Sequence, residues 1–215
     1  MQNNSAFIFT NTFVKHPDNF FFNNAIKIAV DKGANYLEKN NIVPDIVIGD
    51  MDSVSPLVKK KMEKQSKIIE FFPEKDESDT ELAIKWCYEN SIKKIVIFNS
   101  LEKKIDHSLG IVSNLFFAHS LGIKSKIVSH LQEVYPLNRH FSYSGEIGDI
   151  LSILPFGVDL CGVKTDGLFY ELKGENLSYI KTKGISNILE KNEISISVKS
   201  GHGIIVITKK RGFKG

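Results

Sequence analysis

The chain is 215 residues long, with 42% hydrophobic and 25% charged residues and a formal net charge of +3. This composition is typical of a folded globular protein, and the nearly balanced charge argues against a dedicated nucleic-acid binder. No apolar run approaches the length of a membrane span or a signal peptide, and Cys87 and Cys161 lack metal-ligand spacing. We therefore expect a soluble cytoplasmic protein without nucleic-acid or membrane partners, whose basic residues at 209–211 and 214 form a solvated tail.

Short apolar runs alternate with helical patterns through the first two thirds of the chain. The runs predict strands at residues 6–10, 26–30, 45–48, 67–72, 94–98 and 124–129. Helical patterns follow at 34–40, 56–65, 79–88 and 106–121, with a turn or helix start at 17–24. Ser55 before Pro56 is a helix start, and Ser78 with Glu81 fits a capping box. The alternation predicts an α/β domain over residues 1–132, with a mainly parallel, Rossmann-like sheet covered by helices on both faces.

The helical pattern ends near residues 131–140. Short alternating runs then predict strands at 150–154, 168–170, 194–198 and 204–207, and glycine-containing turns separate them. The Ser-Gly-His-Gly segment at 200–203 is typical of a hairpin turn between the last two runs. We therefore expect an all-β second domain over residues 133–215.

The most informative motif is Gly49-Asp50-Met51-Asp52-Ser53, which directly follows the apolar run at 46–48. Two carboxylates two residues apart on a strand-like backbone point the same way, so they repel unless a cation or a proton lies between them. Further acids follow the other predicted strands: Asp31, Asp76, Asp79 and Asp106. Because the loops after parallel strands emerge at one edge of the sheet, these acids are expected to converge on one crevice. Mg²⁺ that bridges carboxylate and phosphate oxygens would supply the counter-charge.

Each acid also has an ordinary structural interpretation. Asp79 would favour the dipole of a first helical turn, Asp106 would serve as an N-cap, and the Asp50/Asp52 pair could lie in a solvated loop. His107 adjoins Asp106 and could touch a ligand, although a histidine at a helix start is more often structural. The sequence contains no P-loop and no Gly-x-Gly-x-x-Gly after the first strand, which disfavours a dinucleotide oxidoreductase.

Together these motifs resemble those of the thiamine pyrophosphokinases. Four segments occur in that family's order: Pro44-Asp45, Gly49-Asp50-Met51-Asp52-Ser53, Lys75-Asp76-Glu77-Ser78-Asp79 and Ile105-Asp106-His107-Ser108-Leu109. The segment at 29–35 is similar to the family's Ala-Asp-Gly-Gly-Ala-Asn. In the second domain, three further segments resemble the thiamine-binding β-domain: Thr165-Asp166-Gly167-Leu168, Gly184-Ile185-Ser186-Asn187 and residues 203–207. The resemblance covers essentially the whole chain.

The resemblance implies transfer of the diphosphate of ATP to the hydroxyl of thiamine, which gives thiamine diphosphate and AMP. It also implies an α/β domain for Mg-ATP, a C-terminal β-sandwich, and a homodimer with sites at the subunit interface. Carried over residue by residue, the catalytic acids are Asp50, Asp52, Asp76, Asp79 and Asp106, and the first four would bind the metal. Contacts to ATP would come from Asp31, Gly33, Ser53, Lys104 and His107. Contacts to thiamine would come from Thr165, Gly167, Leu168, Tyr170, Ser186 and Asn187, and an aromatic face such as Tyr170 suits the thiazolium cation.

The chain departs from the family pattern at several positions. Lys32 replaces a glycine, Lys104 stands where an arginine is usual, and Ile111 stands where asparagine is common. A lysine cannot grip phosphate in the bidentate manner of arginine. Two other functions remain open at this point: a diphosphotransferase for another alcohol, such as a hydroxymethylpterin, and a non-catalytic nucleotide or thiamine sensor. The sequence also does not separate the acid that orients the attacking hydroxyl from those that bind metal.

Overall fold

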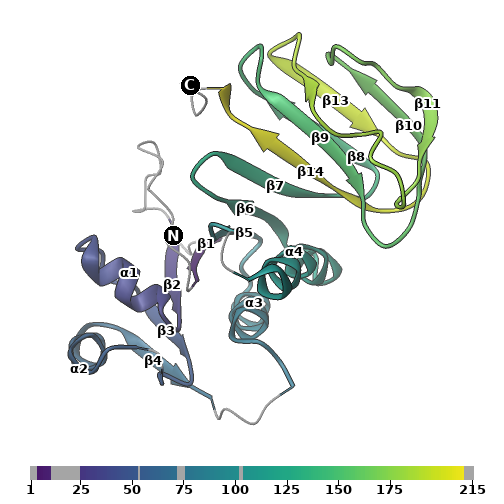
Figure 1. Ribbon diagram of the computed structural model, residues 1–215. Helices are drawn as coiled ribbons and strands as arrows, with labels where there is room; N and C mark the ends of the chain where they lie inside the picture. The colour runs from purple at the N-terminus through teal and green to yellow at the C-terminus, as the bar shows by residue number, and fades with distance from the viewer. Residues whose placement is uncertain (1–3, 11–24, 53, 72–75, 102–103, 211–215) are drawn as a thin grey trace. The chain divides into compact units, whose positions relative to one another are not determined.

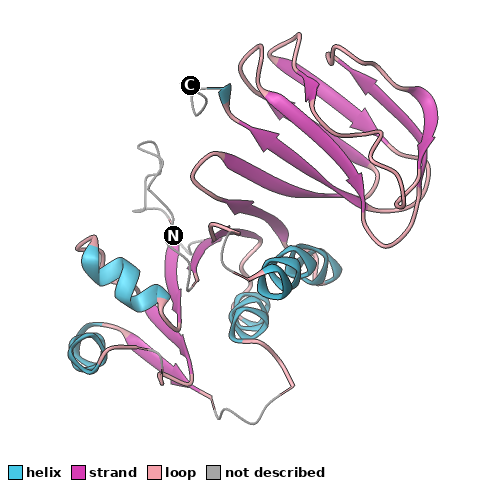
Figure 2. Cartoon of the chain, in the orientation of Figure 1, coloured by secondary structure: helices cyan, strands magenta, loops and turns pink. Residues whose placement is uncertain are grey.

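The computed structural model describes residues 4–10, 25–52, 54–71, 76–101 and 104–210. The chain divides into two compact units, unit 1 (Met1–His130) and unit 2 (Leu131–Gly215). All four α-helices of the described ranges belong to unit 1 (Figure 2), and none of them is long and apolar enough to cross a membrane. The segment predicted at 17–24, and the residues Ser53, Glu102 and Lys103, lie outside the described ranges.

Unit 1 is built on a parallel sheet whose order, within this unit, is β6-β5-β1-β2-β3-β4 (Figure 1). Its strands are β1 (Ser5–Phe9), β2 (Ile26–Val30), β3 (Ile46–Gly49), β4 (Lys67–Glu70), β5 (Lys94–Phe98) and β6 (Lys124–Val128). Every pairing between them is parallel. The apolar runs therefore identified these strands correctly, with bounds that differ by at most two residues.

Helices cover both faces of this sheet (Figure 1). They are α1 (Gly33–Lys39), α2 (Pro56–Gln65), α3 (Asp79–Glu89) and α4 (Ile105–Ser120). Alternate strand residues face opposite ways, so Phe9 packs in one cluster with Leu37 of α1 and Met62 of α2. Ile8, the residue before Phe9 in β1, is fully buried on the other face, where α3 contacts β1, β2 and β3. This layered α/β arrangement is the one that the sequence predicted.

Unit 2 consists of two antiparallel sheets, ordered β12-β9-β14-β7 and β11-β10-β13-β8. The strands are β7 (Gln132–Leu137), β8 (His140–Ser144), β9 (Ile150–Pro155), β10 (Leu160–Asp166), β11 (Lys173–Leu177), β12 (Asn187–Ile188), β13 (Glu193–Ser197) and β14 (Gly203–Thr208). Buried side chains from both sheets form one core cluster, for example Ile205 of β14 and Ile196 of β13. Unit 2 is therefore a β-sandwich, as the resemblance implied.

Two local predictions for unit 2 were wrong. Residues 168–170 do not form a strand, because they turn the chain between β10 and β11, and only Leu168 makes an isolated bridge there. The segment at 200–203 is not a hairpin turn, because β13 pairs with β8 and β10 whereas β14 pairs with β7 and β9 in the other sheet. It carries the chain across the sandwich, and a Cβ at Gly201 would lie 2.0 Å from the carbonyl oxygen of Asp159.

The buried carboxylate of Asp149 holds the end of β14 in place. Asp149 is 1% exposed, its Oδ1 accepts a hydrogen bond from the backbone N–H of Lys210 at 2.9 Å, and its Oδ2 lies 3.5 Å from Lys209 Nζ. The Lys209 ammonium group also lies 4.7 Å from the ring centroid of Tyr143. The prediction of a solvated basic tail is therefore wrong for Lys209, which is half-buried.

Candidate active site

A cleft of about 410 Å³ lies at the carboxyl edge of the sheet in unit 1. The ends of β1, β2 and β5 and the first turns of α3 and α4 supply its walls. Its described lining residues are Thr10, Val30, Asp31, Lys32, Ser78, Asp79, Thr80, Asn99, Lys104, His107, Ser108 and Ile111. Four residues predicted to bind phosphate or nucleotide, namely Asp31, Asp79, Lys104 and His107, are thus brought together.

The strand order explains why a cleft forms at this place. From β1 the chain steps outward through β2, β3 and β4, then returns through α3 to β5 on the other side of β1. The connections that follow neighbouring strands therefore diverge at β1, which leaves a crevice beyond the carboxyl ends of the strands. The N-termini of α3 and α4 both reach this crevice, and the unpaired N–H groups of a helix N-terminus favour an anion.

The Asp50/Asp52 pair lies in a turn and not on a strand-like backbone, which corrects the premise of the sequence argument. Strand β3 ends at Gly49, and Met51 adopts a left-handed conformation with φ of 61°. The Met51 side chain is 4% exposed and packs in the core cluster of α1 and α2, so it anchors the turn. The Asp50 carboxylate stabilises this turn, because its Oδ1 accepts from the backbone N–H of Asp52 at 3.1 Å.

Electrostatics link this turn to the cleft. The pKa of Asp52 lies above its ordinary value, first because its side chain shares a hydrogen bond with Asp50 and then because the Asp50 charge repels it. The charge of Asp79 also raises this pKa, whereas the charge of Lys32 lowers it. Asp50 and Asp52 are not among the described lining residues, but Asp52 is close enough to Asp79 and Lys32 of the cleft to interact with both. Of the acids that the sequence predicted to converge on one crevice, Asp31 and Asp79 are among the described lining residues of the cleft, and a shared site for all of them stays a prediction.

Asp31 is fixed at the base of the cleft by its backbone. Its φ is 47°, its N–H donates to the Ile48 carbonyl at 3.1 Å, and its carbonyl accepts from Ala34 N–H at 3.0 Å. The side chain fills the space beside Gly49, where a Cβ would lie 1.9 Å from Asp31 Oδ1. Gly33 is needed for a similar steric reason, because a Cβ there would lie 2.0 Å from the Phe9 carbonyl oxygen.

The start of α3 combines a cap with an acid. Ser78 and Glu81 form the predicted capping box, and Asp79 occupies the first helical position while lining the cleft. Both interpretations of Asp79 therefore apply, because it complements the helix dipole and also faces the cleft. Asp76 is exposed in the bend that precedes the helix, and it is not among the described lining residues.

The start of α4 places Lys104, and not Asp106, at the N-cap. The N-cap interpretation of Asp106 is thus wrong: it lies in the first turn and is exposed, and its Oδ1 accepts from the His107 N–H at 2.8 Å. Lys104 and His107 line the cleft, whereas Asp106 is not among the described lining residues. The Lys104 carbonyl accepts from both the N–H and the hydroxyl of Ser108, each at 2.9 Å.

Sequence reasoning missed buried polar residues of the cleft, among them Thr10 and Asn99. They follow β1 and β5, and they are only 4% and 7% exposed. The Asn99 Nδ2 donates to Thr10 Oγ1 at 2.7 Å, and the Thr10 hydroxyl donates to the Phe98 carbonyl at 3.1 Å. The available signal was the same as for the acids, a polar residue at the carboxyl end of an apolar run.

In unit 2, Asn187 and Thr165 bond to the backbone. The Asn187 Oδ1 accepts from Tyr170 N–H at 2.9 Å, and its Nδ2 donates to the Tyr170 carbonyl at 2.8 Å. Thr165 Oγ1 accepts from Leu172 N–H at 2.8 Å. These bonds shape the turn that presents Tyr170, which is 66% exposed and lies edge-on to Phe169 with ring centroids 4.7 Å apart.

The other three residues predicted to contact thiamine differ in accessibility. Leu168 is 1% exposed and belongs to the sandwich core, so the structure gives it a packing role. Gly167 is also buried, with φ of 84°, and a Cβ there would lie 2.9 Å from the Glu193 carbonyl oxygen. Ser186 is exposed with φ of 61°, and its N–H donates to Ser152 Oγ at 3.0 Å.

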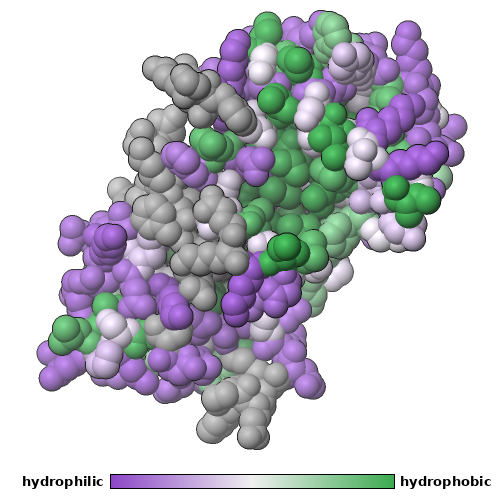
Figure 3. All heavy atoms as spheres, viewed as in Figure 1, coloured by the Kyte–Doolittle hydropathy of each residue, from purple (hydrophilic) through white to green (hydrophobic). Residues whose placement is uncertain are grey.

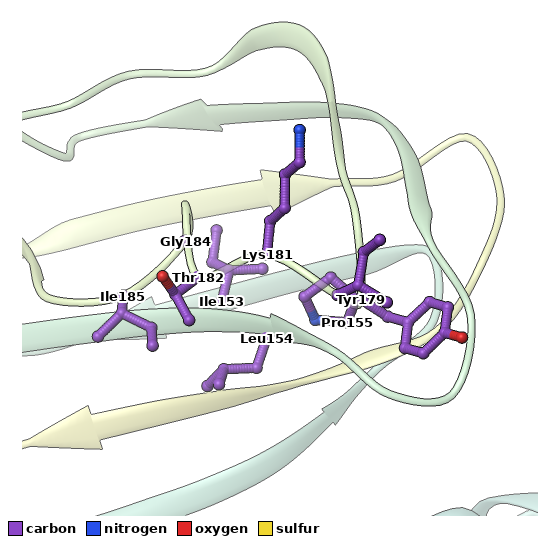
Figure 4. A pocket seen from close by; sticks show the side chains of 9 residues that line it. Ile153, Leu154, Pro155, Tyr179, Lys181, Thr182, Gly184 and Ile185 are labelled. Carbon is purple, nitrogen blue, oxygen red and sulfur yellow. The ribbon is translucent and has the colours of Figure 1, made fainter.

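Two surface hollows lie near these residues. An open one of about 500 Å³ is lined by Leu168, Phe169, Tyr170, Glu171, Leu172, Lys173, Glu175, Lys183 and Glu190. A smaller one of about 200 Å³ lies between β9 and residues 179–185, and its walls are mostly apolar (Figure 4). The first contains an aromatic pair and three glutamates, which suit a flat cation, together with two lysines, which oppose it. Within the described ranges, no group of three or more His, Cys, Asp or Glu side chains is arranged to hold a metal ion.

Two family sequence profiles match the chain. The catalytic domain of thiamin pyrophosphokinase matches residues 18–127, and the vitamin B1 binding domain of thiamin pyrophosphokinase matches residues 133–204. The thiamine pyrophosphokinase of Bacillus subtilis strain 168 is 28% identical over 183 residues, which are 83% of this chain and 85% of that protein.

The fold is also similar to solved structures. The crystal structure of thiamine pyrophosphokinase from Bacillus subtilis gives a TM-score of 0.86 at 22% identity, and covers 96% of this chain and 99% of that one. Thiamin pyrophosphokinase from Candida albicans gives 0.83 at 16% identity, with 97% and 90% of the two chains covered. At these identities the structural likeness concerns the fold.

Proposed function

The chain belongs to the thiamine pyrophosphokinase family, and we propose that the cleft of unit 1 is where it binds Mg-ATP. As a member of that family it is an ATP-dependent diphosphotransferase that converts thiamine to thiamine diphosphate and releases AMP. The observation that carries the assignment of the site is the meeting of Asp31, Asp79 and Lys104 with two helix N-termini in one cleft. The match of unit 2 to a vitamin B1 binding domain favours thiamine over a hydroxymethylpterin as the acceptor.

The reaction requires positioning and charge neutralisation more than covalent chemistry from the protein. The thiamine hydroxyl oxygen attacks the β-phosphorus, the bond from this phosphorus to the bridging oxygen breaks, AMP leaves with that oxygen, and the hydroxyl proton passes to water. In the proposed site, Lys32, Lys104 and the first turns of α3 and α4 hold the phosphates. Asp106 or Asp79 is positioned near the start of its helix to orient the hydroxyl or its proton.

The carboxylates also fit a magnesium ion by their chemistry. Mg²⁺ prefers oxygen ligands, and with nucleotides it is usually held by one or two carboxylates together with phosphate oxygens and water. Asp50 and Asp52 form such a pair. The pKa of Asp52 is raised first by its side-chain hydrogen bond with Asp50 and then by the Asp50 charge, and a cation would relieve the second effect. Asp76 and Asp79 stay predicted ligands beside them. When bound, the ion offsets the negative charge that develops on the phosphate oxygens.

For the acceptor, the exposed Phe169–Tyr170 pair and the nearby glutamates are the proposed partners of the thiazolium cation. Ser186 supplies an exposed hydroxyl for the aminopyrimidine, and Asn187 contributes through the turn that it ties to Tyr170. Thr165 and Gly167 support the same turn from β10.

One assay tests the activity directly. The protein is incubated with Mg-ATP and thiamine, and the nucleotides and thiamine esters are separated by chromatography. AMP and thiamine diphosphate in equal amounts are expected. ADP with thiamine monophosphate would indicate a simple kinase, and an absence of thiamine-dependent nucleotide turnover would reject the activity.

A homodimer with sites at its interface is likewise a proposal. One sheet of unit 2 carries half-buried apolar side chains on the face opposite the core, namely Val206 and Ile204 of β14, with Leu154 of β9 opposite Ile204. Apolar surface gathers over these strands (Figure 3). Light scattering after gel filtration is expected to give twice the chain mass, and Val206→Lys to give the single mass; a wild-type monomer would contradict the proposal.

A cytoplasmic location stays a prediction of the sequence.

A further inference from the structure

We infer that Asn99 is a positioning residue for the nucleotide, because its side chain lines the cleft and holds the turn at Leu101 that follows β5. The inference rests on the proposed function, since it assumes that the cleft of unit 1 binds the phosphates of ATP. Asn99 follows β5, the neighbour of β1, so it lies beside the point where the connections of the sheet diverge. The side chain that shapes this point therefore shapes the centre of the cleft.

The Asn99 side chain makes two hydrogen bonds, one through its amide nitrogen to Thr10 and one through its amide oxygen to Leu101. Its Nδ2 donates to Thr10 Oγ1 at 2.7 Å, which ties the end of β5 to the end of β1. Its Oδ1 accepts from Leu101 N–H at 2.7 Å, which folds the next residues back over the side chain. The backbone N–H of Asn99 donates to the Val128 carbonyl of β6 at 3.2 Å, so the residue is held from three directions.

The bond to Leu101 stabilises an unfavourable backbone conformation. Leu101 has φ of 59°, a left-handed conformation that a residue with a branched side chain rarely adopts. Asparagine carbonyls commonly stabilise such turns by accepting from the N–H two residues onward. Lys104, the N-cap of α4, follows three residues later and lines the cleft together with His107. Asn99 lines the same cleft as this cationic group and this helix N-terminus, so the turn that it holds borders the place where the phosphates would bind.

The bond to Thr10 fixes Asn99 itself. The Thr10 hydroxyl accepts from Asn99 and donates to the Phe98 carbonyl at 3.1 Å, so its donor is used inside the structure. A buried hydroxyl whose one donor is used inside the structure cannot donate to the nucleotide, so we assign Thr10 the role of supporting the asparagine. Thr10 and Asn99 are therefore expected to act as one unit.

The test measures the affinity for a non-cleavable ATP analogue, with a methylene bridge between the α- and β-phosphorus atoms, by calorimetry in the presence of Mg²⁺. Asn99→Ala and Thr10→Val should each weaken binding about tenfold, which is the upper range for one lost hydrogen bond. The double variant should be no weaker than Asn99→Ala alone, because the two residues form one unit. Thr10→Ser, which keeps the hydroxyl, should restore the affinity.

Ser125→Ala is the matched control. The Ser125 hydroxyl donates to the Leu115 carbonyl at 3.2 Å and so ties β6 to α4 away from the cleft. This control should leave nucleotide affinity unchanged, and the KM for thiamine should be unchanged in all variants. If Asn99→Ala lowers Tm but binds the analogue as tightly as Ser125→Ala does, the residue is merely structural and the inference is overturned.

The proposed activity and the proposed role of Asn99 are tested by different measurements. A wild-type protein that binds the analogue but forms no AMP with thiamine would reject the activity, and the affinity comparison would still decide the role of Asn99. A wild-type protein that does not bind the analogue would overturn the inference together with the assignment of the cleft.

Discussion

Replacing Gly49 by alanine should damage both the fold and the nucleotide site. The added Cβ would lie 1.9 Å from Asp31 Oδ1, whereas non-bonded atoms approach to about 3.5 Å, so the carboxylate must move by about 1.6 Å. The Asp31 backbone cannot follow, because it is bonded to Ile48 and to Ala34. The φ of 146° at position 49 adds strain for any residue with a Cβ. We expect a loss of about 1–3 kcal/mol in the free energy of unfolding.

The same displacement should weaken Mg-ATP binding by about tenfold, as expected for the loss of one good polar contact. Urea unfolding and calorimetry measure the two effects. Gly110→Ala is the matched control, because nothing lies within 4 Å of a Cβ at this position in α4. It should raise stability by about 0.5–1 kcal/mol through helix propensity. Wild-type stability and affinity in Gly49→Ala would refute the steric argument.

Three further substitutions test the site. Asp50→Asn should reduce AMP formation at least 100-fold with the fold intact. It should also lower the pKa of Asp52, because Asp50 is the main cause of its rise. The Asp52 titration, followed by NMR, should therefore move to lower pH, and an unmoved titration would contradict the coupling. Lys32→Ala should raise the KM for ATP about fivefold, whereas Lys32→Arg should leave it unchanged. A Lys32→Ala variant with the KM of the wild-type protein would show that Lys32 does not bind phosphate. Leu168→Ala should lower the unfolding free energy by about 2–5 kcal/mol without changing the KM for thiamine. Tyr170→Ala should raise the KM for thiamine and leave Tm unchanged. The reverse pattern would show that Leu168 is the substrate contact.

The sequence predicted unit 1 well because its signals are local. The central strands β2 and β3 are apolar runs with few exposed residues. Helices α2 and α3 begin with a side-chain cap that can be read from adjacent residues, Ser55 and Ser78. The acids of the cleft were found for a related reason. In a parallel sheet every strand delivers its next residues to the same edge, so position in the chain predicts position in space.

Unit 2 was predicted less well because its signals are long-range. Strand β11 is exposed at four of its five residues and therefore shows no apolar alternation. Nothing near residues 200–203 in the sequence indicates that the strands on either side belong to different sheets. The Thr10–Asn99 pair was missed in unit 1 for the same physical reason, since its hydrogen bond joins residues 89 positions apart.

Strand β14 lies between two other strands of its sheet, but the ribosome makes it after both of them. It pairs with β7 on one side and β9 on the other, yet it is the last of the described strands in the chain. While the ribosome translates the roughly 65 residues after β7, the edges of β7 and β9 that β14 later covers have no native partner. Unpaired apolar strand edges are aggregation-prone, and N-terminal domains generally fold first during translation. Unit 1, whose strands precede this interval, can therefore reach its fold before unit 2 does, and slow translation between residues 137 and 203 would lengthen the exposed period.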